Sequence, residues 1–413
     1  MSTPAPDFQN TVAEPRAEYR VGLQPERPLK VAVLNRVFAR SGGGAESYSI
    51  AVVEQLASTH EVHVFAQQID HDWPGVHYHR IGSPGAKPRW VNQLWYAWAT
   101  WRATRQGFDV VHSHENTWHG HVQTIHVRPL RFNLLAKRSG VALALRWAKI
   151  VLSPRLLSYV GLEAARFRPQ AGRQIAVASH SLGQEVVQTY PHAQAMLQVL
   201  PPGVNMPSLL AQTHPLARQQ AREKWDLPDT AQVLLFVAND YARKGLDTLL
   251  LALVLLPEQV MLLVVGNPRS QADYAKQVRA LGLGPRVVFA GALSDVSPAY
   301  RAADALVHPT LEDSFGMVVL EAMSYALPVV VSGPNWCGAA SLLHDGTDSI
   351  ILQDPHDASA IAKGVQRLLQ EPGLASQLGA QALQLAQAHS WAAVGEAYAC
   401  LYAAAAVQAK SPA

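Results

Sequence analysis

Short apolar runs alternate with longer amphipathic segments along the chain from Leu29 onward. The first half contains the runs LKVAVLN, EVHVFA, DVVHSH, VQTIHV and IAVAS. The second half contains VLLFVA, VMLLVVG, VVFAG, DALVHP, LPVVVS and SIILQ, with helix-like stretches such as GLDTLLLALVLL and DASAIAKGVQRLLQ between them. Continuous apolar runs of this length are typical of strands in parallel sheets, because helices cover both faces of such a sheet. The pattern therefore predicts an α/β protein.

A segment rich in chain breakers, PPGVNMP, separates the two series of strands and is the best candidate for a domain joint. A chain of 413 residues exceeds what one hydrophobic core usually organises. We therefore predict two Rossmann-like domains facing each other across a cleft, over residues 29–203 and 204–385. The stretch WAAVGEAYACLYAAAA predicts a last helix within residues 386–407, which can pack back on the first domain.

The composition indicates a globular protein of a reducing compartment. The apolar fraction is 49%, and the two cysteines, Cys337 and Cys400, are too few for a disulfide framework. Residues 1–28 are polar and contain five prolines, which fits a disordered tail better than a signal peptide or a spanning helix. We expect a cytoplasmic protein.

The net charge of +3 hides an asymmetry between the two halves of the chain. Between Lys87 and Arg155, 11 basic residues face only Asp109 and Glu115, and tryptophans are interleaved with them. Such a basic, aromatic surface suits the headgroups of an anionic inner membrane, although a solvated basic face is equally compatible with the pattern. Nucleic acid is not expected as a partner, because no recognised nucleic-acid-binding motif accompanies the charge.

Two features of the first half could carry chemistry. Three glycines in RVFARSGGGAES, including Gly43 and Gly44, follow a strand and precede a helix, where backbone amides can approach a phosphate. Five histidines, His112, His114, His119, His121 and His126, fall within fifteen residues. Their spacing matches no recognised metal site, so we expect no metal and assign a role in the cleft to His126 alone.

In the second half, two candidate sites follow predicted strands. Arg243 and Lys244 in NDYARKG stand at a strand end, where a diphosphate would bind. The second is EDSFGMVVLEA, residues 312–322, which places two carboxylates, Asp313 and Glu321, eight positions apart around a helix start. A carboxylate there can accept the hydroxyls of a sugar or a ribose, while amides of the helix start hold phosphate.

These motifs together resemble the family 4 retaining glycosyltransferases of GT-B fold, whose signature is two acids eight apart around a Phe-Gly pair. Here that signature is Asp313, Phe315, Gly316 and Glu321, followed by EAMSYALPVV. The segments SGGGAE, TIHV and LPPGV look like the family's glycine loop, cleft histidine and interdomain joint. NDYARKG and LVHPTLEDSFGMVVLEA look most like the lipopolysaccharide core glucosyltransferase I group.

The resemblance implies a metal-independent, retaining hexosyltransferase that uses a nucleotide diphosphate sugar, with UDP-glucose favoured, and a lipid-linked saccharide acceptor at the membrane. It implies no other cofactor. By the same resemblance, the donor is held by Glu321 at the ribose, Asp313 at the sugar hydroxyls, the backbone of Phe315, Gly316 and Met317, and Gly43 and Gly44 from the first domain. Arg243 and Lys244 would neutralise the leaving diphosphate, His126 would lie near the anomeric carbon, and the base would lie against VFAGAL.

The sequence departs from the family pattern at two donor-site positions. Asn239 replaces the arginine that is common five residues before the lysine, and Asp313 replaces a glutamate. The donor sugar is therefore left open, and no motif identifies the acceptor. Two alternatives also stay open: a sugar-nucleotide epimerase of the same fold and a non-catalytic sugar-nucleotide-binding protein.

Overall fold

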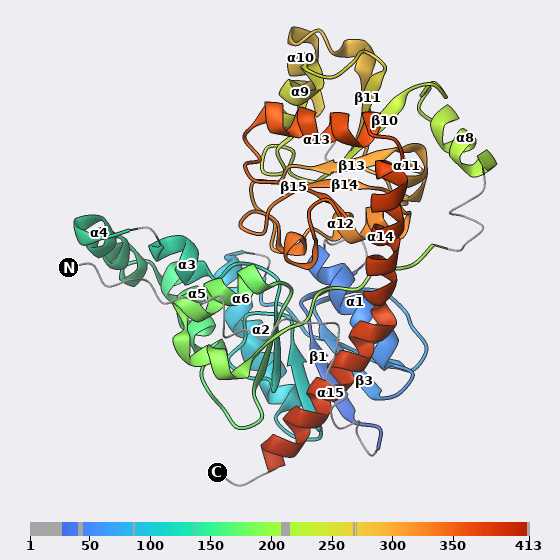
Figure 1. Ribbon diagram of the computed structural model, residues 1–413. Coiled ribbons are helices and arrows are strands. Elements are labelled where there is room, and N and C mark those ends of the chain that lie inside the picture. The colour runs from blue at the N-terminus through green and yellow to red at the C-terminus, as the bar shows by residue number, and fades with distance from the viewer. Residues whose placement is uncertain are drawn as a thin grey trace.

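The computed structural model describes residues 27–39, 44–85, 87–136, 138–207, 215–266, 269 and 271–410. The chain forms two domains, each built around a parallel sheet with helices on both faces (Figure 1). The prediction of an α/β protein with two Rossmann-like domains is confirmed. Most of the predicted tail and Gly43 lie outside the described residues.

The first sheet has seven strands in the order β5-β3-β1-β6-β7-β8-β9. Their bounds are β5 (Val76–Arg80), β3 (Glu61–Ala66), β1 (Lys30–Leu34), β6 (Val110–Ser113), β7 (Val122–Ile125), β8 (Gln174–Val177) and β9 (Leu197–Val199). The helices of this domain are α1 (Gly44–Leu56), α2 (Arg89–Thr104), α3 (Leu130–Leu135), α4 (Gly140–Val151), α5 (Pro154–Arg166) and α6 (His180–Thr189). A short parallel pair, β2 (Val37–Ala39) and β4 (Gln68–Asp70), lies beside the main sheet.

The second sheet has six strands in the order β12-β11-β10-β13-β14-β15. Their bounds are β12 (Val287–Gly291), β11 (Val260–Val265), β10 (Gln232–Val237), β13 (Ala305–His308), β14 (Val329–Ser332) and β15 (Ile350–Leu352). The helices are α8 (Pro215–Glu223), α9 (Leu246–Val254), α10 (Gln271–Ala280), α11 (Ser297–Ala302), α12 (Met317–Ser324), α13 (Ala358–Gln370) and α14 (Leu374–Ala388).

The strand β10 shows why the apolar runs of the sequence are continuous rather than alternating. Val233 and Leu235 face a core that includes residues of α8, α11, α12 and α14. Leu234 and Phe236 face a second core with residues of α9, α10 and α13. Both faces of the sheet are covered, so the strand is apolar at every position after Gln232.

The last helix, α15 (Trp391–Lys410), crosses from the second domain and packs on the first (Figure 1). Trp391, Val394, Tyr398 and Leu401 share one apolar core with strands of the first sheet and with α1. The backbone at Gly203 lies close to the start of α15: a Cβ on Gly203 would lie 2.7 Å from the Cα of Trp391. Among the described residues, no helix is both long and apolar enough to cross a bilayer.

Strand order also fixes where ligands can collect. In the first sheet, the strands that follow β1 are added toward one edge and those that follow β6 toward the other. In the second sheet, the same reversal lies between β10 and β13. In open α/β sheets, ligands bind outside the carboxyl ends of strands at such reversal points. The residues that follow these four strands are therefore the candidates for the site.

Candidate active site

Residues 312–316 belong to the loop that leads from β13 into α12, and we call them the donor loop because the sequence analysis assigns them to the sugar donor. Backbone hydrogen bonds hold the donor loop against the loop after β14. The amide of Asp313 donates to the carbonyl of Trp336 at 2.8 Å, and the amide of Gly338 donates to the carbonyl of Asp313 at 3.1 Å. A side chain at Gly338 would collide with the carbonyl oxygen of Ser314. The loop is thus held in one position, and the Asp313 carboxylate stands at the reversal point of the sheet.

Asp313 forms a compact charged cluster with Lys244, which follows β10, and with His308, the last residue of β13. The Lys244 Nζ lies 2.6 Å from Asp313 Oδ2 and also donates to the carbonyl of Glu312 at 2.9 Å. His308 Nε2 lies 3.2 Å from the same carboxylate oxygen. Burial alone would raise the pKa of Asp313, but the His308 hydrogen bond and the Lys244 charge outweigh it and hold that pKa well below its usual range. Asp313 is therefore a permanent carboxylate.

The helix α12 starts directly beside this cluster. Gly316 precedes it with a φ of +94°, a left-handed conformation that favours glycine, and a Cβ there would lie 2.9 Å from the Cys337 sulfur. Phe315 is buried and anchors the turn from inside. The amides at Gly316 and Met317 thus stand at the positive end of a helix dipole, next to a carboxylate and an ammonium group.

Glu321, the second predicted acid, lies in α12 and is held by a residue that sequence analysis did not single out. The hydroxyl of Tyr300, on α11, donates to Glu321 Oε2 at 2.6 Å. Burial raises the pKa of Glu321, and the Tyr300 hydrogen bond opposes that shift. One carboxylate oxygen of Glu321 is thus oriented by the Tyr300 hydroxyl.

Arg243 does not join its neighbour Lys244 in the cluster. Its side chain is 59% exposed and pairs with Asp240 at 3.7 Å. Gly245 follows them with a positive φ, and a Cβ there would collide with the Pro309 carbonyl. Lys244 is thus the cation that the structure places beside Asp313.

On the first domain, the described residues with a predicted role in the site are Gly44 and His126. Gly44 begins α1, and a Cβ on it would lie 4.0 Å from the Met317 sulfur of the second domain. His126 Nε2 lies 2.9 Å from His114 Nδ1, and its ring packs edge-on against Tyr48 with centroids 5.1 Å apart. Burial, with the charge of Arg166, lowers the pKa of His126 to about 3, so its imidazole is neutral at physiological pH.

The five clustered histidines do not form a metal site among the described residues. They make separate contacts instead: His112 bonds the hydroxyls of Tyr402 and Thr124, both at 2.7 Å. His121 Nδ1 accepts from the amide of Val111 at 3.1 Å. His112 therefore belongs to a buried polar network under α15.

Family comparisons agree with this geometry on both sides of the cleft. Residues 42–206 match the family described as Glycosyltransferase Family 4, and residues 217–385 match Glycosyl transferases group 1. The two matches include the glycine loop, His126, Lys244 and the acids of the donor loop. The chain belongs to the GT-B glycosyltransferases.

Curated relatives of this glycosyltransferase cover part of its length. It is 27% identical over 227 residues to the lipopolysaccharide glucosyltransferase WaaG of Escherichia coli, which covers 54% of this chain and 60% of WaaG. It is 29% identical over 248 residues to a D-inositol 3-phosphate glycosyltransferase of Streptosporangium roseum, which covers 57% of this chain and 55% of the relative. The matched region thus spans little more than half of these relatives.

Solved structures share the fold over nearly the whole glycosyltransferase. The crystal structure of WaaG superposes with a TM-score of 0.74 and 22% identity, covering 89% of this chain and 98% of that one. Anabaena HepE, solved in complex with UDP and glucose, gives a TM-score of 0.68 and 18% identity, covering 89% and 97%. At this level of identity, the likeness concerns the fold.

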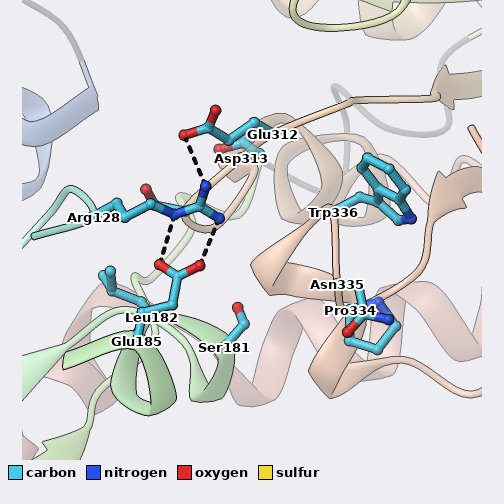
Figure 2. Close-up of a pocket in the computed structure, with 10 residues that line it drawn as sticks. Arg128, Ser181, Leu182, Glu185, Glu312, Asp313, Pro334, Asn335 and Trp336 are labelled. Carbon is cyan, nitrogen blue, oxygen red and sulfur yellow. Dashed lines mark hydrogen bonds and ion pairs between the residues drawn. The ribbon is translucent and has the colours of Figure 1, made fainter. Parts of the chain in front are cut away.

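The two domains also touch through polar contacts that the sequence analysis missed. Arg128, two residues after His126, makes a two-bond ion pair with Glu185 of α6, at 2.8 and 2.6 Å. A third arm, Nη1, lies 3.6 Å from Glu312 of the donor loop (Figure 2). Ser179 adds a second link, since its hydroxyl donates to the Ser314 carbonyl at 2.7 Å.

This bridge lines a small pocket beside Asp313. Figure 2 shows Arg128 between the two carboxylates, with Trp336 and Asn335 across the pocket. No motif signals the bridge, because its members come from three distant segments and only the closed fold brings them together.

The Glu312 arm of the bridge predicts a measurable effect on domain closure. Glu312→Gln removes the interdomain ion pair and leaves the Arg128–Glu185 pair intact. Because Glu312 is 44% exposed, its pair contributes at most about 1 kcal/mol, which corresponds to roughly fivefold in the ratio of open to closed molecules. Single-molecule energy transfer between dyes on the two domains measures this ratio.

The matched control is Glu371→Gln, which removes an exposed ion pair with Arg367 inside the second domain. It should leave the opening equilibrium unchanged. If the distribution of dye-to-dye distances is the same in the Glu312→Gln variant and in the native protein, the bridge does not bias domain closure.

Proposed function

We propose that this glycosyltransferase is a retaining, metal-independent hexosyltransferase that moves a hexose, with glucose favoured, from a UDP-sugar to a glycolipid or lipopolysaccharide core acceptor. The observation that carries the proposal is the Lys244–Asp313–His308 cluster at the start of α12. It combines a cation for a leaving diphosphate with a permanent carboxylate for sugar hydroxyls. The likeness to WaaG, a lipopolysaccharide glucosyltransferase, and to HepE, solved in complex with UDP and glucose, supports this donor.

In this proposal each donor-site residue acts on one part of the substrate. Lys244 neutralises charge that develops on the leaving diphosphate, a task that a divalent cation performs in other transferases. Asp313 accepts hydrogen bonds from the sugar, the amides at Gly316 and Met317 bind phosphate, and Glu321 binds the ribose. Neutral His126 contributes a hydrogen bond near the anomeric carbon, on the face opposite the donor loop.

Retention is proposed to follow a front-face course, in which the departing phosphate oxygen helps to deprotonate the acceptor hydroxyl. A double displacement needs a carboxylate available to attack the anomeric carbon. Glu185, an acid of the first domain beside the cleft, is bound by two arms of Arg128. This engagement argues against Glu185 as a nucleophile and supports the front-face course.

The acceptor side of the proposal is supported by the helix α4, which projects from the first domain (Figure 1). Its apolar side chains are largely exposed, with Val141 at 77%, Leu145 at 67% and Val151 at 60%. Arg146 and Lys149 lie on the same helix, within the basic stretch Lys87–Arg155. A helix with exposed apolar and basic residues suits the headgroup region of an anionic membrane, where a lipid-linked acceptor would be presented.

A donor screen tests the proposed function directly. Thermal shift and slow hydrolysis are measured with UDP-glucose, UDP-galactose, the N-acetylhexosamine donors, GDP-mannose and ADP-heptose, with and without EDTA. We expect UDP-glucose to stabilise the protein, by about 2.7 kcal/mol at 100 times its dissociation constant, and to be hydrolysed at the same rate in EDTA. Conversion of the donor to its epimer without acceptor would favour an epimerase. Unchanged turnover in Asp313→Asn would favour a non-catalytic role of this site.

Removal of the cluster's cation should slow transfer strongly. Lys244→Ala is expected to lower the transfer rate by on the order of a hundredfold, because the leaving diphosphate loses its neutralising charge. The control is Lys276→Ala, which removes an exposed lysine paired with Asp273 at 3.5 Å on α10. Steady-state kinetics measures both variants, and a near-native rate in Lys244→Ala would remove Lys244 from the mechanism.

Membrane binding should depend on charges of α4 and on salt. Arg146→Glu combined with Lys149→Glu is expected to weaken binding to anionic liposomes at least about tenfold, since each basic residue near the surface contributes about 1 kcal/mol. Lys363→Glu combined with Arg367→Glu, on α13 of the second domain, is the control pair. If the fraction of protein that floats with the liposomes changes neither with salt nor with the α4 substitutions, the proposed membrane contact is contradicted.

A further inference from the structure

Four polar residues gather on one face of the first sheet at its outer edge. Glu61 and His63 lie two positions apart on β3, and His77 and His79 lie two apart on β5. The two strands are parallel, and His63 is the register partner of His77. Side chains two apart on a strand share a face, so all four project from the same side of the edge.

The side chains make direct contacts with one another. His63 Nε2 lies 2.9 Å from Glu61 Oε1, and His63 Nδ1 lies 2.8 Å from His79 Nε2. The ring of His77 stacks on that of His63 with centroids 4.6 Å apart. One ligand atom from each of Glu61, His63 and His77 lies within 4.8 Å of the others, the one such group of three or more among the described residues.

We propose that Glu61, His63 and His77 form a binding site for a divalent transition-metal ion of the zinc class. Two imidazoles and one carboxylate are ligands that Zn²⁺ accepts, with a water molecule in the remaining position. Two nitrogens bound to one zinc ion stand roughly 3.4 Å apart, which follows from Zn–N bonds of about 2.0–2.1 Å. In the structure the ligand atoms lie within 4.8 Å of one another. The exposed side chains of Glu61 and His77 can rotate to shorten this separation, while buried His63 stays fixed.

The contacts of His63 and Glu61 fit this role. Metal-bound histidines usually place their second ring nitrogen in a hydrogen bond that fixes the ring, and His79 supplies that partner to His63. His79 is thus a positioning residue. Lys30, opposite Glu61 on β1, pairs with Glu61 Oε1 at 2.8 Å. The second carboxylate oxygen of Glu61 can then bind the ion. Alternatively, the ion displaces the half-exposed ammonium group of Lys30 from Glu61.

The site stands apart from the proposed transfer chemistry. Glu61 begins β3, so the cluster lies toward the amino ends of the strands, whereas the cleft lies at their carboxyl ends. A metal here joins β5, an edge strand, to β3 and strengthens the margin of the sheet. The ion is therefore a stabilising element, and its removal should not alter the transfer rate at temperatures where the protein stays folded.

Metal titration of the full chain tests the proposal. The protein is first treated with EDTA and then titrated with Zn²⁺ by calorimetry and with Co²⁺ by absorption spectroscopy. We expect one tight site per chain, d–d bands typical of a four- or five-coordinate Co²⁺ ion, and a rise of several degrees in the melting temperature. Absence of a saturable site would overturn the proposal.

Substitution of the exposed ligands locates the site without disturbing the core. Glu61→Gln and His77→Gln should each weaken Zn²⁺ binding by at least about a hundredfold, and His79→Gln by about 10–100-fold, as expected for a hydrogen-bonded outer partner. His356→Gln, which alters an exposed histidine paired with Asp354, is the control and should bind Zn²⁺ like the native chain. Native affinity in either ligand variant, each with a native circular dichroism spectrum, would overturn the assignment.

Discussion

The ion pair between Lys244 and Asp313 is the contact around which the donor side of the cleft is arranged. The two residues come from loops after neighbouring strands, and their charged atoms lie 2.6 Å apart with both side chains mostly buried. Desolvation offsets much of the attraction in such a pair, so it is weak evidence for a stabilising role. The surrounding backbone is nevertheless built to place it: Gly245 and Gly316 have positive φ and stand where a Cβ would meet neighbouring atoms. A costly arrangement supported in this way is best explained by a ligand that needs both charges.

The same arrangement couples the donor loop to the first domain. Glu312 and Ser314, on either side of Asp313, contact Arg128 and Ser179 across the cleft. Closure of the domains and positioning of the carboxylate therefore use the same five-residue loop. The helix α15 packs on the first domain, so the two domains are joined at two points, through the segment that leaves β9 and through the segment that enters Trp391. Such a double connection permits a hinge while it limits the directions in which the cleft can open.

Sequence analysis predicted the parts of this protein that depend on local pattern. The continuous apolar runs predicted most strands of both sheets, because burial on two faces leaves few polar positions, as in β10 after Gln232. The spacing of Asp313 and Glu321 predicted one acid in the loop before a helix and the other one turn into that helix, and the structure has Asp313 before α12 and Glu321 within it. Short strands such as β9 escaped prediction, since its residues LQV show no distinctive pattern.

What escaped prediction depends on long-range geometry. Sequence alone treated Arg243 and Lys244 as equivalent cations, whereas in the structure Lys244 pairs with Asp313 and Arg243 with exposed Asp240. The run of histidines drew attention to residues 112–126, yet the described group with metal-ligand spacing is Glu61, His63 and His77. Its signal was the strand register between β3 and β5, which periodicity does not reveal because parallel strands can pair in several registers.

In the proposed function, the leaving diphosphate needs a positive charge that the buried histidines of the first domain do not supply. Burial lowers the pKa of His126 to about 3, and the pKa of His114 also lies well below its ordinary value, so this pair faces the donor without charge. Their 2.9 Å hydrogen bond agrees with that state, since one neutral ring donates and the other accepts. A neutral imidazole can orient a sugar hydroxyl but cannot offset a developing diphosphate charge. In the proposed function Lys244, held by the Asp313 carboxylate, supplies that positive charge, so stabilisation of the leaving group would depend on the loops of the second sheet.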